Sequence, residues 1–352
     1  MQSAGANNYS SNNVIYFSRP LSDKILLLQV LVGVFLYINC LMIFTFLKKE
    51  FFREETRYIL FAQTLFVDSA LMLLTDLLSV GTYFQYAMHI IPCSIICTIL
   101  TFLACCTPLT LVAMCLERYV AICLPLRHAN ISTSRTRLYG LLIIWCISSI
   151  IPVFNFIGYW VVPPAAQYSY AVCTAELMLG EAWQAHGRAV IFIILFLVLI
   201  ITIVFTYIKI MIAAKAASPE KWKSTNKSLK TVLLHAFQLF LCIMQFLNPY
   251  IEMAYWKAEE ITLRNIKYSM FVVFMIAPRC LSPFIYGLRD KNFFHVLRHY
   301  AFCGVYGVLT GGLKLNQISS YCTTAVFLFF VLQLLLQKVQ LQSALHFGHL
   351  EN

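Results

Sequence analysis

The 352-residue sequence is poor in charge: Asp, Glu, Lys and Arg together make up 12% of it, whereas hydrophobic residues make up 60%. Its mean hydropathy is +0.76. A water-soluble domain exposes more charge, so a soluble protein is excluded and the long apolar runs predict a polytopic membrane protein. The chain also lacks a motif for a catalytic nucleophile, a metal site or a cofactor. We therefore expect no enzyme activity, no metal and no cofactor.

Acidic residues are especially scarce, with 15 Asp and Glu against 26 Lys and Arg and a formal net charge of +11. The excess does not indicate a nucleic-acid partner, because the basic residues gather in short loops between apolar runs. That distribution is typical of loops on the cytoplasmic side of a membrane. The partner it predicts is the lipid bilayer.

Seven apolar runs are long enough to cross a bilayer, which needs about 20 residues each. The loops after odd-numbered runs are basic, so the N-terminus is expected to be extracellular and the chain to be a multi-pass plasma-membrane protein. The predicted fold is an all-α membrane protein, a seven-transmembrane helix bundle. The expected spans cover about 24–47, 58–82, 93–122, 138–162, 187–213, 229–255 and 266–287.

The regions around the spans differ in composition. Residues 1–22 are polar and should form an extracellular tail, in which Asn8 begins a glycosylation sequon or a chance match to one. Residues 23–302 should hold the bundle and, after the seventh span, a short amphipathic helix on the inner leaflet. Residues 303–352 form a tail whose extra apolar segment, 321–336, would span the membrane, lie on it, dock on the bundle or come from a mis-predicted final exon.

Cysteine is present in thirteen copies, mostly inside apolar runs, and its spacing forms neither a disulfide framework nor a metal site. Cys93 and Cys173 are the two that the loop charges place at the outer face. The oxidising exterior favours a disulfide between them. Such a bond would tie the start of the third span to the loop 163–186.

A charged stretch, Glu117-Arg118-Tyr119, lies at the inner end of the third span. A charged pair there is costly unless it faces protein or water, which makes it a candidate functional site. The alternative is an arginine that only reaches along the helix end to the membrane surface.

Two longer motifs surround the spans. Residues 118–126 read Arg-Tyr-Val-Ala-Ile-Cys-Leu-Pro-Leu, and residues 283–290 read Pro-Phe-Ile-Tyr-Gly-Leu-Arg-Asp. Together with the span pattern they resemble the rhodopsin-like (class A) G-protein-coupled receptors and, within them, the odorant receptors, most closely the fish-type branch. Glu117 stands where the family usually has Asp, and Ser282 stands where most class A members have Asn.

The resemblance implies a two-state receptor that couples to a heterotrimeric G protein of the stimulatory type. Glu117 would hold Arg118 in the resting state, and Arg118 would swing toward the fifth and seventh helices on activation. The residues it assigns to coupling and switching are Glu117, Arg118, Tyr119, Tyr207, His235, Pro283 and Tyr286.

Arg279 lies in the middle of the seventh span, where a lone arginine costs at least ~2.5–3.5 kcal/mol. We expect it to pair with Asp68 in the second span, because the resemblance brings those two positions together. A backbone carbonyl or Asp76 is the alternative partner.

The family places its ligand among the third, fifth, sixth and seventh helices, in the outer half. The third span has no carboxylate between Cys93 and Leu116, so an amine anchored there is not expected. The wall predicts a small, mostly neutral organic ligand, an odorant. Its expected residues are Leu100, Thr101, Ala104, Cys105, Ile191, Leu195, Ile243, Phe246, Leu247, Tyr250 and Val272.

Other functions stay open at this stage. The first is a rhodopsin-like receptor for a lipid or a peptide, although the outer loops carry little charge for a peptide. The second is a transporter or channel, although the chain has no internal repeat of the kind those proteins often show. The third is a non-functional product, because the tail after residue 303 has no counterpart in the family.

Overall fold

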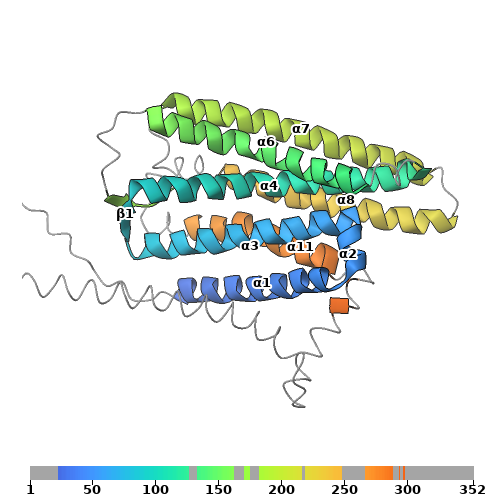
Figure 1. Ribbon diagram of the computed structural model, residues 1–352, viewed down its shortest axis with the longest axis horizontal. Coiled ribbons are helices and arrows are strands. Elements are labelled where there is room, and N and C mark those ends of the chain that lie inside the picture. Colours follow the sequence, from blue (N-terminus) through green and yellow to red (C-terminus); the bar gives the residue numbers. More distant parts are fainter. Residues whose placement is uncertain are drawn as a thin grey trace, which may run out of the picture.

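Long helices that run side by side make up the computed structural model (Figure 1). It describes residues 23–126, 133–161, 170–174, 182–215, 219–247 and 266–287, together with Phe293, Val296 and Leu297. Asn8, Tyr250, the tail 303–352 with segment 321–336, and most of the expected amphipathic helix lie outside these residues.

Six of the described helices are long and apolar enough to cross a membrane. Each follows a predicted span, because the bilayer thickness sets the length of the apolar run. They are α1 (Asp23–Lys48), α3 (Thr56–Tyr83), α4 (Ile90–Cys123), α6 (Ser134–Val161), α7 (Ala182–Lys215) and α8 (Pro219–Phe246).

The seventh span is helical from residue 266 to 287, but it changes its winding along the way. The π-helix η3 (Phe271–Ile276) precedes α11 (Ala277–Gly287), and the Ala277 N–H donates to the Val272 carbonyl, five residues back. With this seventh helix, the predicted all-α seven-helix bundle is confirmed.

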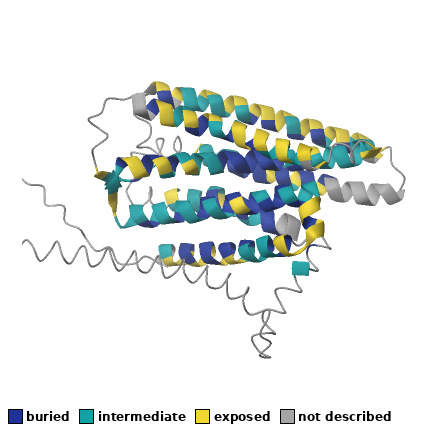
Figure 2. Cartoon of the chain, in the orientation of Figure 1, coloured by how far each residue is buried: buried dark blue, intermediate teal, exposed yellow. Residues whose placement is uncertain are grey.

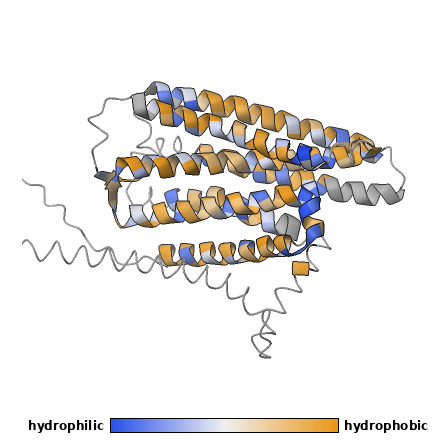
Figure 3. Ribbon diagram, in the orientation of Figure 1, coloured by the Kyte–Doolittle hydropathy of each residue, from blue (hydrophilic) through white to orange (hydrophobic). Residues whose placement is uncertain are grey.

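The bundle is organised around α4, which contacts α3, α6, α7 and α8. Its buried positions are concentrated in its middle, between Ala104 and Cys115, as the dark blue segment in Figure 2 shows. By contrast, α7 turns an apolar surface outward, with Ile193, Leu197 and Ile201 all more than half exposed. Figure 3 shows this surface of α7 as hydrophobic, as expected of a helix that faces lipid.

One predicted boundary of the sixth helix was wrong. The short basic loop expected before residue 229 is helical from Pro219 onward. Helix α8 is described as far as Phe246, and the expected end of the span near 255 lies outside the described residues. An apolar pattern marks the part of a helix inside the membrane, and a helix can continue into water with a polar composition. Proline suits the first turn, because its missing N–H would have no helical partner there.

The outer end carries a small sheet that the sequence did not predict. Strand β1 (Ala87–His89) pairs antiparallel with β2 (Tyr170–Val172), and Ala87 lies opposite Val172. The disulfide between Cys93 and Cys173 lies beside it, with the two Cα atoms 5.6 Å apart. The predicted disulfide is thus present and holds the second outer loop against the start of α4.

The inner end is closed by aromatic packing. Phe293, after the seventh helix, is fully buried, with its ring 5.2 Å from Phe52 of the short helix α2 (Glu50–Glu54) and 5.5 Å from Phe61 of α3. The apolar side of the expected amphipathic helix therefore packs on the bundle at this position.

Candidate functional site

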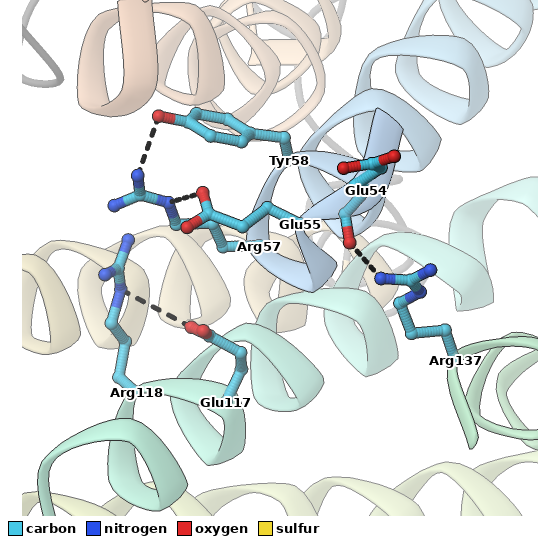
Figure 4. Close-up of polar contacts among 7 residues, drawn as sticks. All are labelled: Glu54, Glu55, Arg57, Tyr58, Glu117, Arg118 and Arg137. Atoms are coloured by element: carbon cyan, nitrogen blue, oxygen red, sulfur yellow. Dashed lines mark hydrogen bonds and ion pairs between the residues drawn. The ribbon is translucent and has the colours of Figure 1, made fainter. Parts of the chain in front are cut away.

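The inner end of α4 carries the charged pair that the sequence singled out. The Arg118 Nε lies 3.7 Å from the Glu117 Oε2, with 19% of the Arg118 side chain and 12% of the Glu117 side chain exposed (Figure 4). A pair so sheltered is screened less by salt than an exposed one. The expected contact between the two side chains is present, and its role in a closed resting state stays a prediction.

Two neighbouring arginines order the same end of the bundle. Arg57 donates to the Glu55 carboxylate at 2.8 Å and to the Tyr58 hydroxyl at 2.8 Å. Arg137, near the start of α6, donates to the backbone carbonyl of Glu54 (Figure 4). The beginnings of α3 and α6 thus meet beside the end of α4.

The other predicted switch residues lie on the helices expected of them. The Tyr119 ring is 5.9 Å from Phe205 of α7, and Tyr207 packs half-buried against the core. His235 of α8 is fully buried, and Pro283 lies inside α11. The side chain of Tyr286 is outside the described part. The swing of Arg118 toward Tyr207 and Tyr286 stays a prediction.

Asp68 is fully buried in the middle of α3. It accepts hydrogen bonds from the Thr107 hydroxyl at 2.8 Å and from the Ser282 hydroxyl at 3.4 Å. The carboxylate therefore links α3 to α4 and α11.

The predicted ion pair between Asp68 and Arg279 is wrong as a direct contact. The Arg279 guanidinium, 1% exposed, donates to the Met275 carbonyl at 2.6 Å and to the Phe274 carbonyl at 3.2 Å. Pro278 has no N–H to give to the Phe274 carbonyl, so the guanidinium takes the place of that donor. The alternative, a backbone carbonyl, is the one the structure has.

A second set of bonds joins α11 to α8. The Arg279 Nη2 donates to the Gln245 Oε1 at 2.7 Å. The Gln238 Nε2 donates to the Pro278 carbonyl at 2.8 Å and to the Ser282 hydroxyl at 2.7 Å. We call these five residues the α8–α11 clasp. It is a polar connection between the sixth and seventh spans.

The sequence analysis missed the glutamine side of this clasp. Gln238 and Gln245 are seven residues apart, so they lie two turns apart on one side of a helix. Both interrupt an otherwise apolar run, and that spacing was a signal that they face a common neighbour.

The predicted ligand pocket is brought together only in part. Leu100 and Ala104 of α4 pack with Phe246 and with Met275, and Leu195 of α7 and Ile243 of α8 pack in the adjoining core. Cys105 is buried, and Thr101 donates to the Cys97 carbonyl at 2.8 Å. Ile191 is half-buried, Leu247 is exposed, and Val272 instead packs against α1.

Two aromatic residues of the same region were missed. The Phe246 ring lies 4.3 Å from Phe192 and 5.2 Å from Phe196, and Phe196 is buried. These rings lie one position along α7 from Ile191 and Leu195. Nearly every residue of that helix is apolar, so its pattern does not reveal which side faces inward.

Comparison with known proteins agrees with this geometry. The sequence model of the 7 transmembrane receptor (rhodopsin family) matches residues 38–286. Odorant receptor 131-2 of Danio rerio is 54% identical over 303 residues, which is 85% of this chain and 93% of that protein. With its seven-helix bundle, its outer disulfide and its charged pair at the inner end of α4, the chain belongs to the odorant receptors of the rhodopsin-like G-protein-coupled receptor family and is not an enzyme.

Proposed function

We propose that the chain detects a small, mostly neutral organic molecule in the outer half of the bundle and activates a stimulatory-type G protein from its inner end. The receptor would lie in the plasma membrane with its N-terminus outside. The observation that carries this proposal is the pair of neighbours Gln245 and Phe246. One bonds to the seventh helix, and the other packs where α4, α7 and α8 converge.

The surroundings of Phe246 support an apolar ligand. Leu100, Ala104, Phe192 and Met275 supply aliphatic and aromatic surface, and the helix that carries the first two has no carboxylate in its outer half. A cation would find no counter-charge on that helix, whereas a neutral molecule would exchange one apolar environment for another.

The position of Phe246 supports a route from ligand to switch. A ligand that enters this cluster must displace or tilt the Phe246 ring, because protein interiors are close-packed. The neighbouring Gln245 would move with it and lose its hydrogen bond from Arg279. The sixth helix would then be free to leave the seventh, which favours an open inner end.

The inner end of the bundle supports coupling to a G protein, because the outward movement of the sixth helix would open it. Opening would expose the Glu117–Arg118 pair to water and to a partner helix, which can enter a groove between helices. Lys230 on α8 is exposed beside that end and would meet acidic groups of a G protein or anionic lipid headgroups.

The test is a screen of neutral odorants in cells that carry the olfactory stimulatory G protein, with cyclic AMP as the readout. For an odorant that activates the receptor, Phe246→Leu should weaken potency, because it removes ring contacts worth about 0.5–1.5 kcal/mol. Phe66→Leu is the matched control, since Phe66 is 52% exposed on α3.

Equal potency in the Phe246 variant and the control would contradict the proposed ligand position. Activation through an inhibitory G protein alone would contradict the proposed coupling.

A further inference from the structure

A cavity of about 370 Å³ lies between α3, α4 and α6, in the inner half of the bundle and away from the proposed ligand position. Its wall includes Leu116, which is 39% exposed, and Ile143, which is 58% exposed, so it belongs to the membrane-facing surface. Ala113 and Gly140 leave room between α4 and α6, and a Cβ added at Gly140 would meet nothing within 4 Å. We call this cavity the inner groove.

The polar residues of the inner groove lie at one end. Thr56 is the first residue of α3, Thr136 and Arg137 lie in the first turn of α6, and Glu117 lies near the end of α4. All four positions are at the cytoplasmic ends of their helices. The rest of the wall is made by apolar side chains and Gly140, so an occupant must be apolar along its body and polar at one tip.

The dimensions of the inner groove select a slender molecule. Its wall on α6 runs from Thr136 to Ile147, which is about 16 Å at the rise of an α-helix. Its volume is near the lower end of small-molecule pockets, which hold roughly 300–1,000 Å³. A single extended chain fits such a space, whereas a two-chain phospholipid does not.

The charges at the polar end select an uncharged head group. The inner groove has one carboxylate, Glu117, and one guanidinium, Arg137, so its formal charge is zero. An acid would be attracted by Arg137 and repelled by Glu117, and an amine the reverse, so a charged head group would gain no net attraction to offset the loss of its hydration. A hydroxyl can both donate to a carboxylate and accept from a guanidinium.

We propose that the inner groove binds a straight long-chain alcohol dissolved in the inner leaflet, with its hydroxyl between Glu117 and Arg137. The site is separate from the odorant position and is reached through the bilayer. A hydroxyl that donates to Glu117 competes with Arg118 for the same carboxylate. Bound alcohol therefore weakens the closed inner end and raises signalling without an odorant.

The binding test uses the purified full-length receptor in lipid nanodiscs and a long-chain alcohol with a photoreactive diazirine in its chain. On irradiation, the alcohol should label peptides from the inner halves of α4 and α6. Unlabelled alcohol should compete, whereas the fatty acid and the alkylamine of equal length should compete at least fivefold less well.

A pair of glycine variants gives the matched control. Gly140→Phe fills the inner groove and should reduce labelling at least fivefold. Gly81→Phe also adds a ring where a Cβ meets nothing within 4 Å, but at the opposite end of α3, and should leave labelling unchanged.

Several outcomes would overturn the proposal. They are labelling that Gly140→Phe leaves intact in folded receptor, equal competition by the acid or the amine, and displacement by a sterol but not by the alcohol. If Gly140→Phe fails to fold, competition on the unmodified receptor still decides. The labelling needs neither odorant nor G protein, so its failure is distinct from failure of the proposed function.

Discussion

The Arg279 guanidinium donates a 2.7 Å hydrogen bond to the Gln245 side-chain oxygen and so joins the seventh helix to the sixth. Both carbonyls that share this guanidinium belong to its own helix. One guanidinium nitrogen of Arg279 therefore satisfies backbone carbonyls near Pro278, and the other binds the Gln245 side chain on α8. Arg279, which was expected from the sequence to pair with Asp68, instead bonds to α8, the helix that moves in the proposed mechanism.

Removal of the Gln245 amide should make the receptor active without ligand. Hydrogen bonds to charged groups contribute about 1.5–3 kcal/mol, and 1.4 kcal/mol corresponds to about a tenfold change in an equilibrium. Gln245→Ala should thus raise basal cyclic AMP roughly tenfold, until the response saturates. Gln184→Ala is the control, because Gln184 bonds to the Gly158 carbonyl between α7 and α6 instead. Unchanged basal signalling in well-expressed Gln245→Ala receptor would remove the clasp from the mechanism.

Asp68 should tolerate loss of its charge better than loss of its polarity. An amide can accept from one hydroxyl and donate to another, so Asp68→Asn should keep Thr107 and Ser282 satisfied. Asp68→Leu leaves both hydroxyls without their acceptor and should lower the free energy of unfolding by about 1–3 kcal/mol. Thermal unfolding of the purified receptor measures the difference.

The exchange of charges between Asp68 and Arg279 gives a sharper test of the same region. Asp68→Arg combined with Arg279→Asp should recover nothing that the single changes lose, because the guanidinium bonds to carbonyls and Gln245. Recovery of surface expression or signalling in the double variant would instead indicate that Asp68 and Arg279 pair directly.

The spans could be predicted from the sequence because the membrane fixes the length of an apolar helix, and the loop charges added an expected orientation. The disulfide followed because only Cys93 and Cys173 were expected at the outer face. The charged pair at Glu117 and Arg118 could be located because adjacent charges at the end of a span are rare.

The partner of Arg279 could not be predicted in the same way. It depends on a change of winding at η3 and on the donor that Pro278 lacks, and hydropathy records neither. The inward side of α7 was equally hidden, because Phe192 and Ile191 are both apolar and only packing distinguishes them. Apolar composition predicts well which residues lie within the membrane, but it predicts poorly which side of a helix faces the interior of the bundle.

Cys97 should replace Cys93 when the latter is removed. The Cys97 and Cys173 sulfurs are 3.9 Å apart, and Cys97 lies one turn along α4 from Cys93. A thiol so close needs only a small rotation to reach disulfide distance. Peptide mapping without reduction should find a bond between Cys97 and Cys173 in Cys93→Ala receptor. As a control, the same mapping of Cys97→Ala receptor should find the original bond between Cys93 and Cys173. An unbonded Cys173 in Cys93→Ala receptor would contradict the prediction.

The two members of the charged pair should have opposite effects when each is neutralised. Glu117→Gln removes the carboxylate that holds Arg118 at 3.7 Å, so the closed state loses a contact and basal cyclic AMP should rise. Arg118→Ala removes the group expected to face the G protein, so signalling should be lost while surface expression is kept. A sheltered pair contributes more than an exposed one, whose contribution is about 0–1 kcal/mol, so the rise in Glu117→Gln receptor should be severalfold. Normal signalling from Arg118→Ala receptor, or lower basal signalling from Glu117→Gln receptor at equal surface expression, would show that this pair does not set the resting state.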